Sequence, residues 1–285
     1  MAMGNAQVAS ANDGYGMYYN PAALPNLQKK QFLASYSSMS LDRQFNYIGF
    51  ALPLRGIAGA SAGWINSGVN DLRSYNSIGE DTGQINHGLN AIYFSFAAKI
   101  IALAQADKAL MSLPSDLINI GVTAKFIRED IDDDADFDYK GQGFGIDLGV
   151  LIKLHQDWRI GYQLKDLNAN LRSNTDDIFE RGSQLDNDFP LTQKAGVFYK
   201  TPFSWLVVAY DFEWSNKGEE RHHIGTELTA DGVAGRIGYD NDRFTVGGGI
   251  KFQTFKETYM SLDYAFMDDV VDEGISHVFS WRFLF

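Results

Sequence analysis

The last eleven residues, 275–285, alternate strictly between two kinds of side chain. Every second position is aromatic: Phe279, Trp281, Phe283 and Phe285. A period of two is typical of a β-strand, with the rings on one face and a mixed face that includes an arginine on the other. No residue follows Phe285 to cover these rings. We therefore expect the aromatic face to lie against lipid, although a soluble sheet could also bury such a face.

The composition narrows the class of protein. The 285 residues suit one barrel, and 14% aromatic residues with 28 glycines fit aromatic girdles and tight packing inside it. No apolar run approaches the roughly 18 to 20 residues of a spanning helix. The net charge of −12 argues against a nucleic-acid partner, and the absence of cysteine excludes disulfides and thiolate metal sites. No charged and apolar leader follows Met1, so we expect that an export signal has been removed.

Strand-like segments and turns alternate along most of the chain. Fourteen segments are predicted, an even number as in single-chain bacterial barrels. They are 30–39, 44–53, 57–66, 90–101, 116–128, 141–154, 157–166, 190–200, 203–214, 220–229, 231–240, 242–253, 256–267 and 275–285. The fold prediction is therefore an all-β, transmembrane antiparallel barrel over residues 30–285, with residues 1–29 as an N-terminal segment.

The alternation also predicts which side chains face the lumen. In segment 242–253, for example, Phe244 and Val246 oppose Thr245 and Lys251. The same reasoning predicts that a set of charged residues points inward: Lys125, Asp147, Arg159, Asp211, Arg236, Asp263 and Arg282. Such groups tune selectivity in an open pore, whereas in a plugged barrel they pair with each other and with the plug. We favour the plugged barrel.

Connection lengths alternate in the way that an outer-membrane barrel requires. Short links near residues 53–56, 156–157 and 230–232 alternate with longer, mostly acidic ones such as 67–89, 129–140 and 167–189, which we assign to the outside. One link, 102–115, is long although it falls on the side of the barrel that has the short turns. Its leucines and alanine suggest a short amphipathic helix, which either packs under the barrel or contacts a periplasmic partner.

One acidic segment, 129–138, has the spacing of a calcium site. Carboxylates stand at every second position: Asp130, Asp132, Asp134 and Asp136. Ca²⁺ prefers such oxygen ligands, but the glycine and the final glutamate of an EF-hand loop are absent. The alternative is a solvated acidic loop bridged to the outer leaflet by divalent ions. No other cofactor is expected.

The sequence contains no residue pattern that is typical of a catalytic site. Of five histidines only His223 is predicted to face inward, and no serine motif lies near it. The glycines at 141, 143 and 145 lie within a strand and lack the spacing of a dinucleotide-binding turn. We expect no catalytic residues.

The N-terminal 29 residues do not alternate. They contain Met3-Gly4-Asn5-Ala6, then Asn12-Asp13, then Tyr18-Tyr19-Asn20-Pro21-Ala22-Ala23-Leu24. This pattern resembles the N-terminal signature of FadL-like outer-membrane barrels, most closely their PorV/PorQ branch. The resemblance implies that the segment folds into the barrel as a hatch, with Asn20, Pro21 and Ala22 as its central motif. Asn5 and Asn12 depart from the pattern.

The resemblance implies two functions. PorV and PorQ members serve type IX secretion by handling secreted proteins, and the short chain favours this interpretation. The alternative is a FadL-like hatch-gated channel for long-chain fatty acids or other hydrophobic molecules. Both imply the outer membrane, periplasmic termini, and contact with lipid, lipopolysaccharide and the barrel assembly machinery. The closing aromatic strand, Phe279 to Phe285, resembles the signal that this machinery reads.

Overall fold

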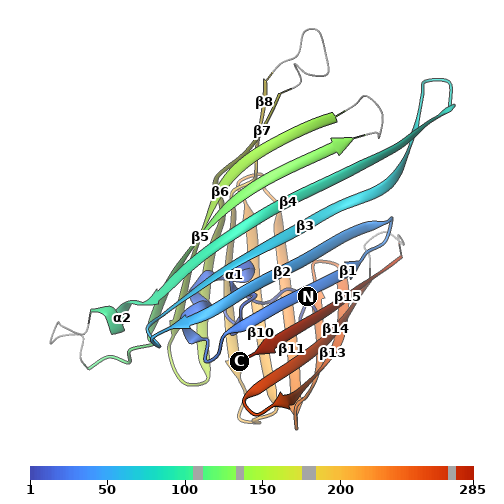
Figure 1. Cartoon of the computed structure of the whole chain (residues 1–285). Coiled ribbons are helices and arrows are strands. Elements are labelled where there is room, and N and C mark those ends of the chain that lie inside the picture. Colours follow the sequence, from blue (N-terminus) through green and yellow to red (C-terminus); the bar gives the residue numbers. More distant parts are fainter. Residues whose placement is uncertain (105–111, 133–137, 175–183, 269–273) are drawn as a thin grey trace.

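A computed structural model describes residues 1–104, 112–132, 138–174, 184–268 and 274–285, and shows one barrel of antiparallel strands (Figure 1). Two short helical elements precede the strands and a third interrupts them. In chain order the elements are α1 (Gly16–Tyr19), η1 (Pro21–Asn26), β1 (Gln31–Ser38), β2 (Arg43–Leu54), β3 (Ala58–Tyr75), β4 (Asp81–Lys99), α2 (Ile100–Leu103), β5 (Ile118–Asp132), β6 (Asp138–Lys153), β7 (Trp158–Asn174), β8 (Gln184–Asp188), β9 (Thr192–Lys200), β10 (Leu206–Ser215), β11 (Glu220–Ala230), β12 (Val233–Asp240), β13 (Arg243–Phe255), β14 (Thr258–Asp268) and β15 (Ile275–Leu284).

The barrel is closed by its first and last strands. β1 pairs with β2 on one side and with β15 on the other, and every strand pairs antiparallel with its neighbours. β8 pairs with the last residues of β7, and β9 pairs with the first residues of β7. β8 and β9 together therefore occupy one strand position in the wall. The wall therefore has fourteen positions. The predicted fold class is confirmed.

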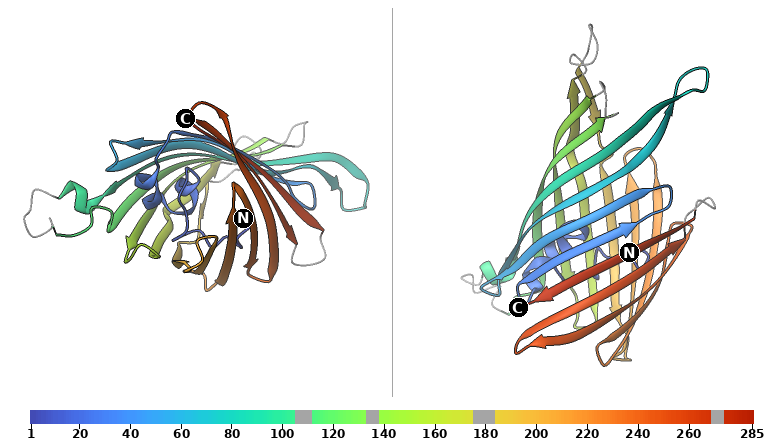
Figure 2. Two further views of the ribbon diagram at one scale, coloured as in Figure 1. Left: turned by 90° about the horizontal axis from the view of Figure 1, so that it is seen from below. Right: turned by 45° about the vertical axis from the view of Figure 1, so that its right-hand side comes forward.

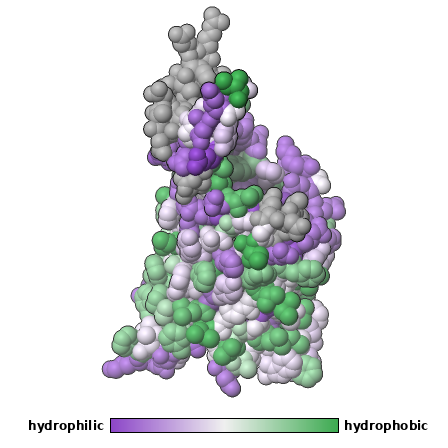
Figure 3. Space-filling model, turned by 90° about the vertical axis from the view of Figure 1, so that its right-hand side faces the viewer, coloured by the Kyte–Doolittle hydropathy of each residue, from purple (hydrophilic) through white to green (hydrophobic). Residues whose placement is uncertain are grey.

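The outside of the barrel is apolar over its middle. One outward row follows the strand register from Ile250 on β13 through Leu262 and Trp281 to Ile48 and Trp64 on β2 and β3. Hydrophobic residues cover the lower body of the visible face, and hydrophilic residues gather at its upper end (Figure 3). Such an apolar band is what a lipid-facing wall requires, because no water is present there to solvate polar groups. Within the described ranges, no helix is long and apolar enough to cross a membrane.

Five strands are longer than the sequence predicted. The segments 67–89, 129–140 and 167–189 were assigned to outer loops, but β3 to β7 continue through much of them and form a wall that rises on one side (Figure 2). Outward side chains in this raised part are polar. An in-register row at the base of this wall carries Asn46, Asn66, Asn90, Arg128, Gln142 and Arg172, and the next outward row, within the segments assigned to loops, carries Gly68, Gly88, Asp130 and Lys140. The loop assignment was wrong because a strand outside the lipid carries polar residues on its outward face.

The predicted helix of segment 102–115 is reduced to a single turn in the described residues. α2 begins at Ile100 and ends at Leu103, directly after β4. Residues 105–111 lie outside the described ranges, so most of the predicted helix does too. Within α2, the side chain of Ile101 is buried.

The interior of the barrel holds residues 1–29, the N-terminal segment. α1 and η1 lie inside the curve of the wall when the barrel is viewed from below (Figure 2). The main apolar cluster joins this segment to the wall: Met17 and Leu24 pack with Leu33, Tyr47 and Ile65. Ala6, Ala22, Ala23 and Leu24 have no exposed surface.

Candidate functional site

The first residues of the N-terminal segment are held by the inner faces of β11 to β13. The Gly4 backbone N–H donates to Thr245 Oγ1 at 3.0 Å, and the Thr245 hydroxyl donates to the Ala2 carbonyl at 3.1 Å. His223 Nδ1 lies 3.1 Å from the Gly4 carbonyl oxygen. Gly4 has φ +58°, and a Cβ there would lie 2.4 Å from the Tyr239 carbonyl oxygen. Only glycine fits this left-handed, wall-contacting position.

Asp211 holds the next turn of the segment. The Val8 backbone N–H donates to Asp211 Oδ2 at 2.9 Å, and Asp211 is fully buried on β10. Lys194 of β9 donates to the Asn5 carbonyl at 3.1 Å, and the Asn5 amide donates to Asp240 Oδ2 at 2.6 Å. Buried charges are costly unless they are paired and hydrogen-bonded. The charged inner face of β9 to β12 is therefore satisfied in part by the segment itself.

Asn20 links two parts of the segment to the wall. It is fully buried, and its Nδ2 donates to the Val8 carbonyl at 2.8 Å and to the Val150 carbonyl of β6 at 3.1 Å. Its Oδ1 accepts from the Ala22 backbone N–H at 3.0 Å, which caps η1. Pro21 follows at the first position of η1, where its missing N–H costs nothing. Asn20, Pro21 and Ala22 thus form a hydrogen-bonded bend inside the barrel, and their role as a hatch motif stays a prediction.

Glycines on the inner faces of the strands make room for the segment. A Cβ on Gly149 of β6 would lie 2.1 Å from Asn20 Oδ1. Further inward glycines lie equally close to the segment backbone, with an added Cβ at 2.0 to 2.6 Å: Gly59, Gly121, Gly161, Gly225 and Gly238. The glycine load noted in the sequence is explained by this contact.

A buried ion-pair group joins the inner faces of β5, β6 and β7. Lys125 of β5 lies 2.7 Å from Asp147 Oδ1 of β6 and also contacts Asp166 of β7. Asp147 accepts from the Asp166 backbone N–H at 2.8 Å. Lys125 and Asp147 are almost entirely buried. These residues were predicted to face the lumen, and their observed contacts are with neighbouring strands.

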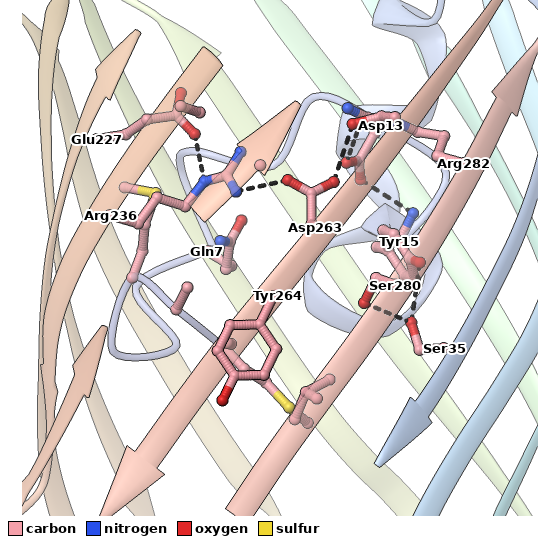
Figure 4. Close-up of a pocket in the computed structure, with 18 of the residues that line it drawn as sticks. Gln7, Asp13, Tyr15, Ser35, Glu227, Arg236, Asp263, Tyr264, Ser280 and Arg282 are labelled. Atoms are coloured by element: carbon pink, nitrogen blue, oxygen red, sulfur yellow. Dashed lines mark hydrogen bonds and ion pairs between the residues drawn. The ribbon is translucent and has the colours of Figure 1, made fainter. Parts of the chain in front are cut away.

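The remaining predicted lumen residues face the N-terminal segment from the other side. Arg282 of β15 forms an ion pair with Asp13, and Arg236 of β12 lies 2.6 Å from both Glu227 and Asp263 (Figure 4). Arg159 donates to the Ser10 carbonyl at 3.4 Å and stacks over the ring of Phe198, 4.0 Å from its centroid. All seven predicted residues thus point inward.

A cavity of about 390 Å³ remains between the N-terminal segment and the wall. Its wall side comes mainly from β12 to β15, β1 and β2, where the inward residues include Ala234, Gly249 and Ala265. Tyr15 and Tyr18 of the segment line the opposite side. Burial raises the pKa of Tyr15 to about 12, so this hydroxyl keeps its proton. We call this space the lumen cavity.

Sequence reasoning missed several residues of the site. Thr245 and Asp240 contact the segment, and Phe45 and Tyr47 line the lumen cavity. Thr245 and Asp240 lie on the inward face that the alternation identified, so they were open to prediction. Phe45 and Tyr47 were not, because the inward face of the first three strands is obscured by their small residues.

The structure describes only part of the predicted calcium segment. Asp130 and Asp132 extend β5 instead of lying in a loop, and Arg128 donates to both oxygens of Asp130, at 3.1 Å and 3.0 Å from its Nε. Asp134 and Asp136 lie outside the described residues. In the described part of the chain, no group of three or more acidic, histidine or cysteine side chains is placed to hold a metal. Calcium binding stays a prediction.

Comparison with known proteins shows which solved structures share this fold. No family model matches the sequence, and none of the curated proteins matches it. Solved structures do match. The toluene transporter TbuX of Ralstonia pickettii superposes with a TM-score of 0.68 at 12% identity, and the match covers 100% of this chain and 97% of that one. The toluene transporter TodX of Pseudomonas putida has a TM-score of 0.66 at 13% identity, covering 100% and 98%.

A third structure extends the likeness. It is a FadL homologue of Pseudomonas aeruginosa, with a TM-score of 0.61 and 10% identity over 98% of this chain and 95% of that one. The chain has a FadL-type fold. At these identities the likeness concerns architecture, and it does not single out the PorV/PorQ branch. The FadL-type barrel described here shares its full length with those structures.

Proposed function

We propose that this chain is an outer-membrane channel that admits small hydrophobic molecules, with the N-terminal segment as its hatch. The observation that carries the proposal is the placement of residues 1–29 inside a closed, lipid-facing barrel, held by contacts to opposite walls. A plugged barrel excludes free diffusion of solutes. Passage therefore requires the segment to shift, and the lumen cavity offers a binding space at the place where it would shift.

The structural likeness supports a hydrophobic cargo. TodX and TbuX are described as toluene transporters, and a further match, CymD, as a monoaromatic hydrocarbon channel. The channel alternative is thus better supported than the PorV/PorQ-type docking role in type IX secretion, which gains no support from these structures. Secreted cargo and secretion-system subunits stay predictions as partners.

The same proposal sets the orientation of the barrel. The raised wall of β3 to β7 and the connections 76–80 and 216–219 face the outside, and the short turns at 55–57, 231–232 and 256–257 face the periplasm. Both termini then belong to the periplasmic side. The polar outward row of the raised wall would contact lipopolysaccharide, and the closing strand β15 would be read by the assembly machinery.

Uptake by intact cells tests the channel. Cells that produce the barrel should take up labelled toluene or oleate faster than cells without it. Ala234→Trp places a large ring in the lumen cavity, whereas Gly235→Trp, one residue away, points toward lipid, where an added Cβ meets nothing within 4 Å. We expect the first variant to lower uptake and the second to leave it unchanged. Equal uptake by both variants and by cells without the barrel would refute the channel.

A further inference from the structure

We propose that the lumen cavity selects small neutral molecules that combine an apolar ring or chain with a hydroxyl group, in preference to bare hydrocarbons. This inference rests on the proposed channel and specifies its cargo. It follows from which side chains face the cavity and how they are paired.

One part of the cavity is apolar and aromatic. Tyr18 of the N-terminal segment packs edge-on against Phe45 of β2, with ring centroids 6.0 Å apart, and Tyr15 packs on Tyr47 at 5.0 Å. Ile65 of β3 lines the same part. Aromatic rings accept other rings at these separations. A ring-sized apolar body therefore finds matching contacts there.

The other part is a strip of hydrogen-bonding groups along the seam of β1 and β15. Ser35 and Ser280 face each other at 2.9 Å, and the Tyr15 hydroxyl lies 2.9 Å from Ser35 (Figure 4). Ser37 lies further along β1 and Arg282 further along β15, on the same inward face. Hydroxyls both donate and accept, so the strip suits a ligand that does the same.

Most charged side chains of the lining are paired with each other. Asp13 is paired with Arg282, while Glu227 and Asp263 are both paired with Arg236. Lys251, the remaining basic side chain of the lining, lies over the ring of Tyr259, 5.3 Å from its centroid. The guanidinium groups therefore already have carboxylate partners, and the lining offers mainly dipoles and hydrogen bonds to a neutral molecule.

The hydroxyl-bearing residues Tyr15, Ser35 and Ser280 of the strip line the cavity. Ser35 and Ser280 are only partly buried, so a ligand in the cavity can reach them. Polar groups are normally hydrogen-bonded, and covering them with an apolar ligand is unfavourable. A bare hydrocarbon would displace water from this strip without replacing its hydrogen bonds. A hydroxylated ligand replaces those hydrogen bonds, which is the source of the selectivity.

Toluene and 4-methylphenol differ by one hydroxyl and test this directly. Their affinities for the purified full-length barrel are measured by titration calorimetry, with empty detergent micelles as the reference. We expect 4-methylphenol to bind with a Kd about tenfold lower than toluene, since a satisfied buried hydrogen bond is worth about that ratio. Equal or tighter binding of toluene would overturn the inference.

Ser280→Ala localises the effect. It should weaken 4-methylphenol binding about three- to tenfold and leave toluene binding unchanged. The matched control is Ser61→Ala on β3, which removes a buried hydroxyl that does not line the cavity. The control should change neither affinity. If Ser280→Ala fails to assemble, Ser35→Ala takes its place. A variant that keeps the wild-type preference contradicts the inference.

The two proposals fail separately. If the barrel binds toluene better but still raises cellular uptake, the channel stands and the hydroxyl preference falls. If 4-methylphenol binds as expected while uptake by cells is independent of the barrel, the channel falls and the binding site stands.

Discussion

Asp13 of the N-terminal segment forms an ion pair with Arg282 of the closing strand. The two residues are 269 positions apart in the chain, and both are largely buried, at 21% and 19% side-chain exposure. The pair joins the N-terminal segment to the strand that completes the barrel. It lies beside the lumen cavity, so it is placed to resist movement of the segment toward that space.

Asp13→Asn should loosen the hatch. Losing the charge on one partner removes about 1–3 kcal/mol of interaction, which corresponds to a roughly five- to 150-fold increase in the open population. Conductance recordings in planar bilayers measure this population. The exchanged pair, Asp13→Arg with Arg282→Asp, should return conductance toward the wild-type level. If Asp13→Asn conducts like the wild type, the pair does not hold the segment.

Gly149→Ala should destabilise the plugged barrel. Its Cβ would lie 2.1 Å from Asn20 Oδ1, and such overpacking typically costs about 1–3 kcal/mol. The temperature at which the folded electrophoretic form disappears should fall. Gly248→Ala on β13 is the control, because its Cβ would have the Ala234 carbonyl oxygen at 3.5 Å as its nearest neighbour. Equal temperatures for the two variants would argue against tight contact at Asn20.

The orientation can be read from single cysteines, since the natural chain has none. Cysteines at Ser77 and Lys217 should react with an impermeant maleimide on intact cells, whereas those at Gln156 and Asp231 should react only after the outer membrane is opened. All four sites are exposed, so accessibility within the protein does not decide the outcome. Reaction of all four on intact cells would contradict the proposed topology.

Phe283→Asp should impair assembly. Phe283 packs outward against Phe32 with ring centroids 6.2 Å apart, and a charge on the lipid face costs on the order of 2–4 kcal/mol at mid-bilayer and less near an interface. Folded, heat-modifiable protein should decrease, as it should when Phe285 is removed. Phe255→Asp, at an exposed turn position, is the control and should assemble normally. Normal assembly of the Phe283→Asp variant would contradict a role of the closing strand in assembly.

The sequence predicted the barrel well where lipid and lumen select opposite kinds of side chain. Phe244 and Val246 point outward and Thr245 points inward, as the period of two required. The prediction failed where both faces of a strand meet water or protein. Arg172 and Asp186 form an exposed ion pair on the raised wall, and the polar segment 167–189 that contains them was interpreted as a loop.

The site was predictable only in part, because its contacts join distant residues. Asn20 was identified as the centre of the hatch motif, but its partners Val8 and Val150 lie 12 and 130 positions away. Both contacts use backbone carbonyls, which carry no sequence signal. The inward charges were found by alternation, whereas their pairing depends on strand register.

The most direct test of the account is a reversible tether between hatch and wall. In the variant G14C/A51C, a disulfide joins the N-terminal segment to β2, because a Cβ on Gly14 would lie 2.9 Å from the Ala51 Cβ, and the chain has no other cysteine. If molecules pass through the lumen when the N-terminal segment moves, oxidised cells should lose barrel-dependent uptake and regain it on reduction. Wild-type cells under the same oxidant and reductant serve as the control. Unchanged uptake in the fully oxidised variant would contradict passage past a moving hatch.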